Sequence, residues 1–170
     1  ALEWLEASGD SVLGILPGRE LAARFVGFDP GATRGAWLHL DVPNREVRVW
    51  RRALPIPTGQ WRGLGLLPNT FPIETFLDEA AHAAGRDPVA FRLEHLATDE
   101  AGRRMGACVE AVAERSGWGT PPPPGRARGF AWTFYHGTVV AEVAEISVDE
   151  ASGRIRVHRV TVAVDCGLAV

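Results

Sequence analysis

The sequence predicts an α+β fold in which a segment of three helices precedes an antiparallel sheet of about three strands. Apolar residues recur at helical spacing between residues 72 and 116, and they alternate with other residues between 130 and 165. The run from Thr120 to Gly125, with four consecutive prolines, is a stiff connector between the two patterns. Helical and extended patterns that are segregated along a chain are typical of α+β proteins.

The first 40 residues match no pattern that we can assign, and we treat residues 1–40 as a separate N-terminal segment. Pro17 favours the start of a helix over residues 17–26. Short strands are predicted over 36–40 and 46–52, because Val47 and Val49 alternate with polar residues. Residues 55–68 are predicted to form a turning loop, since they contain Pro55, Pro57, Gly59, Gly63, Gly65 and Pro68.

Three helices are predicted next. The first covers residues 72–84 and ends before Gly85, and the second runs from Asp87-Pro88 to about residue 96. The third covers residues 99–116 and ends at Gly117. Each has an apolar stripe at helical spacing, so each buries one face.

Three strands are predicted after the proline run. Phe130, Trp132 and Phe134 alternate along the first, and the second and third cover residues 139–148 and 154–165. The turn over residues 149–153 makes the last two an antiparallel hairpin. The apolar phase shifts along the third strand, which predicts either a bulge near His158 or Arg159 or burial on both faces. An open edge on this strand would allow self-association.

Composition excludes several functional classes. A chain of 170 residues is long enough for one cored domain, and its formal net charge of −3 argues against a nucleic-acid partner. No run approaches the roughly 20 apolar residues of a membrane span, so a soluble protein of the cytoplasm or the periplasm is expected. The cysteines lie far apart, and no histidines stand at ligand spacing, so no protein-bound metal site is predicted; these residues are Cys108, Cys166, His39, His82, His95, His136 and His158.

The most informative passage runs from Pro57-Thr58-Gly59-Gln60-Trp61-Arg62-Gly63-Leu64-Gly65 into residues 69–80. It resembles the molybdopterin-binding large subunit of the xanthine dehydrogenase and aldehyde oxidase family, and most closely the beta subunit of isoquinoline 1-oxidoreductase-like enzymes. The resemblance continues in the family's order through residues 84–93, 116–119, 125–131 and 164–167. It covers residues 41–170, which are therefore expected to be a partial molybdopterin-binding domain.

The resemblance implies a set of cofactor contacts. The corresponding loop in related enzymes lies against the molybdopterin cofactor, here expected in its cytosine dinucleotide form, so the residues implied are Gly59, Trp61, Arg62, Gly63 and Gly65. Amides flanked by glycines, together with a guanidinium, suit an anionic cofactor. The complete enzyme would hydroxylate an aldehyde or an N-heterocycle with oxygen from water. Its partners would be the remainder of the large subunit and an iron–sulfur subunit or domain.

Other residues have simpler interpretations. Without the resemblance, Arg62 would be a surface arginine whose stem covers Trp61. Glu74 and Asp78 are expected near a helix N-terminus, where carboxylates stabilise the helix. Asp165 is expected to fix the turn that follows it, and Cys166 to pack in the interior. His136 is given no catalytic role.

The chain lacks the family's general base, a glutamate in a glycine-rich segment near the end of the full subunit, so no catalytic residue is assigned. It begins without methionine and stops after residues 165–167, which suggests a piece of a larger polypeptide. Alone it should be inactive and hold no cofactor stably. The alternative is a stand-alone, non-enzymatic folding or interaction module that keeps the scaffold.

Overall fold

The computed structural model describes residues 2–9, 29–37, 39–52, 54–56, 58–59 and 61–169, and the helix predicted over 17–26 lies outside them. The chain divides into an N-terminal unit, Ala1–Leu38 with Val42–Phe76, and a C-terminal unit, His39–Asp41 with Leu77–Val170. The described residues hold three helices and a three-stranded antiparallel sheet, which confirms the α+β prediction. None of these helices has the length and apolar character needed to cross a membrane.

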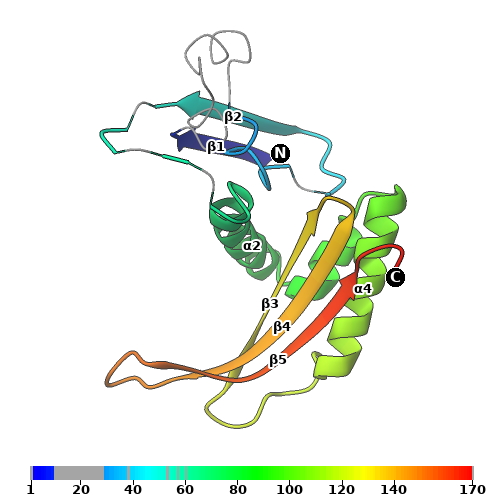
Figure 1. The fold of residues 1–170 in the computed structure, drawn as a ribbon. Helices are drawn as coiled ribbons and strands as arrows, with labels where there is room; N and C mark the ends of the chain where they lie inside the picture. Colours follow the sequence, from blue (N-terminus) through cyan, green and yellow to red (C-terminus); the bar gives the residue numbers. More distant parts are fainter. Residues whose placement is uncertain are drawn as a thin grey trace. The chain divides into compact units, whose positions relative to one another are not determined.

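A two-stranded parallel sheet forms in the N-terminal unit (Figure 1). It pairs β1, Leu2–Ser8, with β2, Arg45–Arg51. The second strand was predicted to within a residue, whereas the first was not predicted. Arg48 pairs with Glu46 at 2.7 Å and with Glu3 at 3.4 Å, and such exposed pairs contribute little to stability.

The strand predicted over residues 36–40 is wrong. Ala36 donates its amide to Thr33 at 3.1 Å and so closes a turn, and Leu40 makes only an isolated bridge with Leu96. Leu38 lies outside the described residues. The bridge also explains why the second helix stops before residue 96, because Leu96 is used in extended pairing instead.

The first helix, α2, spans Leu66–Ala83 and begins earlier than predicted. Pro68 lies in its first turn, where a missing amide hydrogen removes no intrahelical bond, and only Pro72 stands in its interior. Glu74 is therefore buried in the body of the helix, and Asp78 lies further along it. The expectation that these two carboxylates stand near the helix N-terminus is wrong.

The other two helices follow their predicted caps. In α3, Pro88–Glu94, the Asp87 carboxylate accepts from the amides of Val89 and Ala90 at 3.0 and 2.9 Å. In α4, Glu100–Ser116, Asp99 accepts from the Gly102 amide at 2.8 Å, and Gly117 caps the end. The sequence located these helices well because capping is local chemistry.

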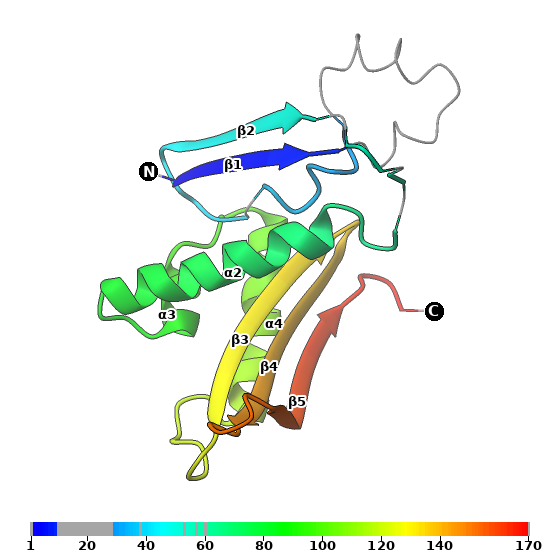
Figure 2. The same ribbon diagram turned by 90° about the vertical axis from the view of Figure 1, so that its left-hand side faces the viewer.

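A curved antiparallel sheet in the order β3-β4-β5 forms the rest of the C-terminal unit (Figures 1 and 2). Its strands are Ala127–Tyr135, Thr138–Val148 and Ile155–Asp165. One face packs against α4 and buries the core of the unit. The core includes Val139, Ala141 and Val143 of β4 and Met105, Val109 and Val112 of α4. Each such side chain contributes about 1.5–3 kcal/mol when fully buried, the alanine less.

The predicted hairpin of β4 and β5 is confirmed, and its phase shift is a bulge. Glu145 pairs with Arg159 and Ile146 pairs with Val157, so His158 is the extra residue on β5. The bulge reverses the alternation of side chains, and it keeps the aliphatic residues before and after it on one face. Burial on both faces, the other explanation of the shift, is not needed.

A fully buried arginine, Arg92 of α3, ties the C-terminal unit together. It donates to the Asp78 carboxylate at 2.7 Å and to the carbonyl of Pro88 at 3.0 Å. Its guanidinium carbon lies 5.3 Å from the centre of the Phe130 ring. A buried cation is tolerated only when it is paired in this way.

We predict that Arg92→Ala lowers the free energy of unfolding by about 2–5 kcal/mol, because it leaves a cavity and removes the partner of Asp78. The matched control is Arg103→Ala, since Arg103 is exposed and its side chain donates only to the Thr98 carbonyl in the described structure. It should cost about 0.5 kcal/mol or less. Denaturant unfolding measures both, and equal losses would contradict the structural role of Arg92.

Candidate functional site

The predicted cofactor loop is a strained turn directly before α2. Leu64 donates its amide to the carbonyl of Trp61 at 2.8 Å and also to that of Arg62. Gly63 has φ +45° and Leu64 has φ +53°, so two consecutive residues are left-handed. For Leu64 this costs about 1–2 kcal/mol. A turn of this kind persists only where its surroundings fix it.

The loop packs against a second turn, residues 29–35, which we call the seat. Gly65 donates its amide to the Gly31 carbonyl at 2.9 Å. A Cβ atom at position 65 would lie 1.8 Å from the carbonyl oxygen of Ala32, so no other residue fits there. The seat is itself rigid, because the buried Asp29 carboxylate accepts from the amides of Gly31 and Ala32 at 2.8 and 3.1 Å.

Asn69, in the first turns of α2, completes the seat. Its buried side-chain amide lies 3.1 Å from the Ala32 carbonyl, 3.0 Å from that of Arg34 and 3.3 Å from the Glu6 carboxylate. One residue therefore joins α2, the 29–35 turn and β1. This arrangement was not predicted, although Asp29-Pro30-Gly31 is a turn signal in the sequence that indicates the 29–35 turn.

Two of the predicted contact residues are open to solvent. Trp61 is 80% exposed, and Arg62 is also exposed. Arg62 thus lies on the surface, as the surface-arginine interpretation expected, but the high exposure of Trp61 leaves little of its ring for the stem of Arg62 to cover. Among the described residues, the Arg62 guanidinium has no hydrogen-bond or ion-pair partner, so its charge is available to a ligand.

The backbone of the loop is less available than predicted. The amides of Leu64, Gly65 and Leu66 already donate within the chain. Among residues 61–65, the donors without an acceptor in the described part of the chain are the Arg62 guanidinium, the Trp61 indole nitrogen and the backbone amides of Trp61, Arg62 and Gly63. Gly65 thus holds the loop in place. Gly59 lies at the far end of the loop, and Gln60 is outside the described residues.

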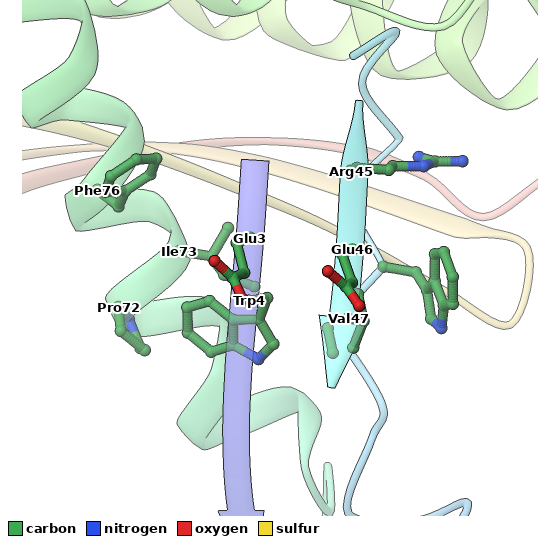
Figure 3. A pocket seen from close by; sticks show the side chains of 10 residues that line it. Glu3, Trp4, Arg45, Glu46, Val47, Pro72, Ile73 and Phe76 are labelled. Carbon is green, nitrogen blue, oxygen red and sulfur yellow. The ribbon is translucent and has the colours of Figure 1, made fainter. Parts of the chain in front are cut away.

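An unpredicted apolar pocket of about 260 Å³ lies in the same unit, between the parallel sheet and α2 (Figure 3). Trp4 of β1 faces Pro72, Ile73 and Phe76 of α2 across it. The indole nitrogen of Trp4 is buried and has no hydrogen-bond partner among the described residues. The pocket was missed because it depends on β1, for which the sequence gives only a short apolar pattern.

At the end of β5, Asp165 fixes the turn that follows it, as predicted, because its carboxylate accepts from the Gly167 amide, whereas Cys166 is exposed and the expectation that it packs is wrong. Arg104 of α4 donates to both Asp165 carboxylate oxygens at 2.7 and 2.8 Å, and the Gly167 amide donates to the same carboxylate at 2.8 Å. The Arg104 hydrogen bonds and then the Gly167 amide lower the pKa of Asp165 from 3.8 to about 2. Cys166 is exposed because β5 ends at Asp165 and the chain turns.

No side chains gather into a metal site in the described ranges, where no three of His, Cys, Asp or Glu lie together. The structure places His136 in the β3–β4 turn, with its ring centroid 4.1 Å from that of Tyr135 in an edge-on arrangement. The chemistry that the described residues offer is therefore binding of an anion at Arg62 and of an apolar group in the pocket.

Comparison with known proteins gives several partial matches. The chain is 36% identical over 134 residues to a nicotinate dehydrogenase subunit of Pseudomonas putida, covering 68% of this chain and 11% of that protein. It is 34% identical over 143 residues to the isoquinoline 1-oxidoreductase beta subunit of Brevundimonas diminuta. This match covers 82% of this chain and 18% of that protein. It is 33% identical over 125 residues to the aldehyde oxidoreductase molybdenum-binding subunit PaoC of Escherichia coli K12. This match covers 68% of this chain and 17% of that protein.

The chain therefore spans less than a fifth of the length of these curated relatives. No family model matches it. The names of the relatives agree with the resemblance that the loop motif indicated.

We predict that Gly65→Ala destabilises the N-terminal unit by several kcal/mol, because the new methyl group would overlap the Ala32 carbonyl. The control is Gly119→Ala, where a Cβ meets no atom within 4 Å. Thermal unfolding and limited proteolysis between residues 29 and 65 measure the effect. A Gly65→Ala protein as stable as the control would show that the close approach does not exist.

The ion pair between Arg104 and Asp165 makes the stability of the fold depend on pH. The folded pKa of Asp165 lies below its ordinary value, so this ion pair stabilises the fold above about pH 4 and loses this contribution as pH falls toward 2. Asp165→Asn should therefore be less stable than the parent chain at pH 6, and the difference should shrink through this window. Urea unfolding between pH 6 and pH 2.5 measures it, and a constant difference would rule out the titration.

Proposed function

We propose that this chain, which belongs to the family of molybdenum hydroxylase large subunits, forms part of the molybdopterin-binding half of such a subunit. Residues 41–170 are assigned this role, and residues 1–40 are left outside it. The complete enzyme would hydroxylate an aldehyde or an N-heterocycle with oxygen from water. It would pass the electrons through iron–sulfur centres on a separate subunit or domain. The names of the relatives support this substrate range.

The observation that carries the proposal is the exposed side chain of Arg62, which lies on a turn with a strained backbone. Two left-handed residues, a glycine without room for a Cβ and a buried asparagine maintain a loop whose arginine has no partner among the described residues. Strain of this kind is found where geometry serves a ligand. The position directly before α2 adds the positive end of a helix dipole.

The donors of the loop fit an anionic cofactor in part. A guanidinium and two amides suit a phosphate or pyrophosphate group, and Trp61 offers an apolar face beside them. When bound, molybdopterin in its cytosine dinucleotide form supplies the redox chemistry. The role of this chain's residues is to bind and orient it: Arg62 and Gly63 by direct contact, Gly59 and Trp61 alongside, and Gly65 by holding the turn.

The chain alone is proposed to be inactive. Its sequence has no match to the glycine-rich glutamate segment that supplies the family's general base. Loss of a positioned base costs roughly 10²–10⁴ in rate. The few donors offered by residues 61–65 are also too few to retain a cofactor without contacts from elsewhere.

A non-enzymatic interaction module is the second candidate, and the open apolar strand β5 favours it. Its valines are exposed, and its outer edge is unpaired within the described sheet, so association of two copies through this edge is proposed for the isolated chain. A reading frame that continues into a glycine-rich glutamate segment beside an iron–sulfur partner would favour the enzyme. A frame without either would favour the module.

We predict that Arg62→Ala in the natural polypeptide weakens cofactor retention roughly 10- to 100-fold, since a charge-assisted hydrogen bond is worth about 1.5–3 kcal/mol. Arg62→Lys should lie between, because lysine keeps the charge and loses the planar fork. Molybdenum per polypeptide after dialysis measures retention, with Arg103→Ala as the control. Full molybdenum in Arg62→Ala would remove Arg62 from the cofactor site.

A further inference from the structure

The face of the β3-β4-β5 sheet that is turned away from α4 (Figure 2) is largely apolar, and its β5 side chains are exposed. On β5, Val160, Val162 and Val164 are 47%, 49% and 59% exposed. The bulge at His158 adds further aliphatic residues to the same row. The row and its neighbours on β4 comprise Ile155, Val157, Val160, Val162 and Val164 with Val140, Ala144, Ile146 and Val148.

These aliphatic side chains form one contiguous apolar patch. Scattered exposed apolar residues need no explanation, but a contiguous apolar patch marks an interface. The bulge strengthens the case. Without it Ile155 and Val157 would point to the face covered by α4, so the chain uses an irregular residue to keep the apolar row continuous.

One carboxylate interrupts this face near its centre. Glu142 of β4 stands between Ala131 of β3 and Val162 of β5. Its side chain is half-buried, and its carboxylate has no hydrogen-bond or ion-pair partner among the described residues. A carboxylate left this way inside a closed apolar interface would be strongly unfavourable, so whatever covers the face must bring a cation to it.

A shallow hollow of about 210 Å³ lies beside Glu142. Gly129 forms part of its floor, and a Cβ there would meet no atom within 4 Å. Phe130, Ala131, Ala144 and Ile146 form the rest of the lining. The hollow is therefore apolar with one acceptor at its side, which suits a side chain with an aliphatic stem and a cationic head.

This charge pattern decides between occupants. A two-fold dimer centred on the face would bring two Glu142 carboxylates together, which is unfavourable in an apolar interface. A different surface that presents aliphatic residues around one arginine satisfies both the row and the carboxylate. Arginine is preferred to lysine because its fork matches a carboxylate.

We propose that this face docks an amphipathic element from the remainder of the large subunit, whose arginine lies over Gly129 and pairs with Glu142. The inference rests on the proposed function, because it takes the covering element from the same full-length polypeptide. It assigns the sheet a role in assembly that is separate from the cofactor loop.

The test uses the natural polypeptide with its cofactor bound. A photo-crosslinking amino acid replaces Val162, next to Glu142, and the crosslinked peptides are identified by mass spectrometry. We expect a crosslink within one polypeptide, to a segment outside residues 1–170 that contains an arginine among aliphatic residues. The same label at Glu110, an exposed residue of α4, should not reach that segment. A crosslink to a second copy, to another polypeptide, or to nothing overturns the proposal.

Charge exchange then tests the ion pair. With the label at position 162, Glu142→Arg should lower the crosslink yield at least about 10-fold, and changing the partner arginine to glutamate in the same protein should restore it. Glu110→Arg is the matched control and should leave the yield unchanged. Equal yields in Glu142→Arg and the parent protein overturn the role of Glu142.

The readouts separate this inference from the proposed function. Molybdenum content tests the proposed function and does not depend on the crosslink. A polypeptide that holds molybdenum but crosslinks elsewhere contradicts only the docking surface. A polypeptide that holds no molybdenum contradicts the proposed function, whatever the crosslink shows.

Discussion

The close approach of Gly65 to the Ala32 carbonyl is the constraint on which the candidate site depends. It leaves no room for a side chain, so loop and seat meet backbone to backbone through the amide of Gly65 and the carbonyl of Gly31. Asn69 then fixes the start of α2 against the same seat. With both ends of the turn held, the strain at Gly63 and Leu64 is maintained and Arg62 is left facing solvent.

The C-terminal unit is held together by paired arginine side chains around an apolar core, and one of them, Arg92, is fully buried. Arg92 links α2, α3 and the Phe130 ring, and Arg104 links α4 to the end of β5. Arg126 and Arg128 hold the buried Glu145 at 2.8 and 3.0 Å, and they keep the pKa of that carboxyl below its usual value. Planar guanidinium groups can satisfy several acceptors at once, which is why such charges are accommodated where lysine would leave gaps.

Both functional proposals follow from groups that the chain positions but does not satisfy. Arg62 is a cation without a described partner, Glu142 is a carboxylate without one, and the β5 valines are apolar without cover. Each calls for a different ligand: an anion, a cation set in an aliphatic surface, and apolar contact. The chain spans less than a fifth of its relatives' length, and under the proposed function the rest of a large subunit would complete these surfaces.

The sequence by itself determined the elements whose signals are local. The caps at Asp87, Asp99 and Gly117, the β4–β5 turn and the phase shift along β5 could be predicted because each depends on a few adjacent residues, and the structure then identified that shift as a bulge at His158. The loop motif likewise identified the family. Only the tertiary structure decided that Leu2–Ser8 pairs with Arg45–Arg51, that α2 starts at Leu66, and that Gly65 packs on Ala32. These features depend on contacts between segments far apart in the chain. Local propensity does not predict such contacts, because the free energy that stabilises them arises only after folding.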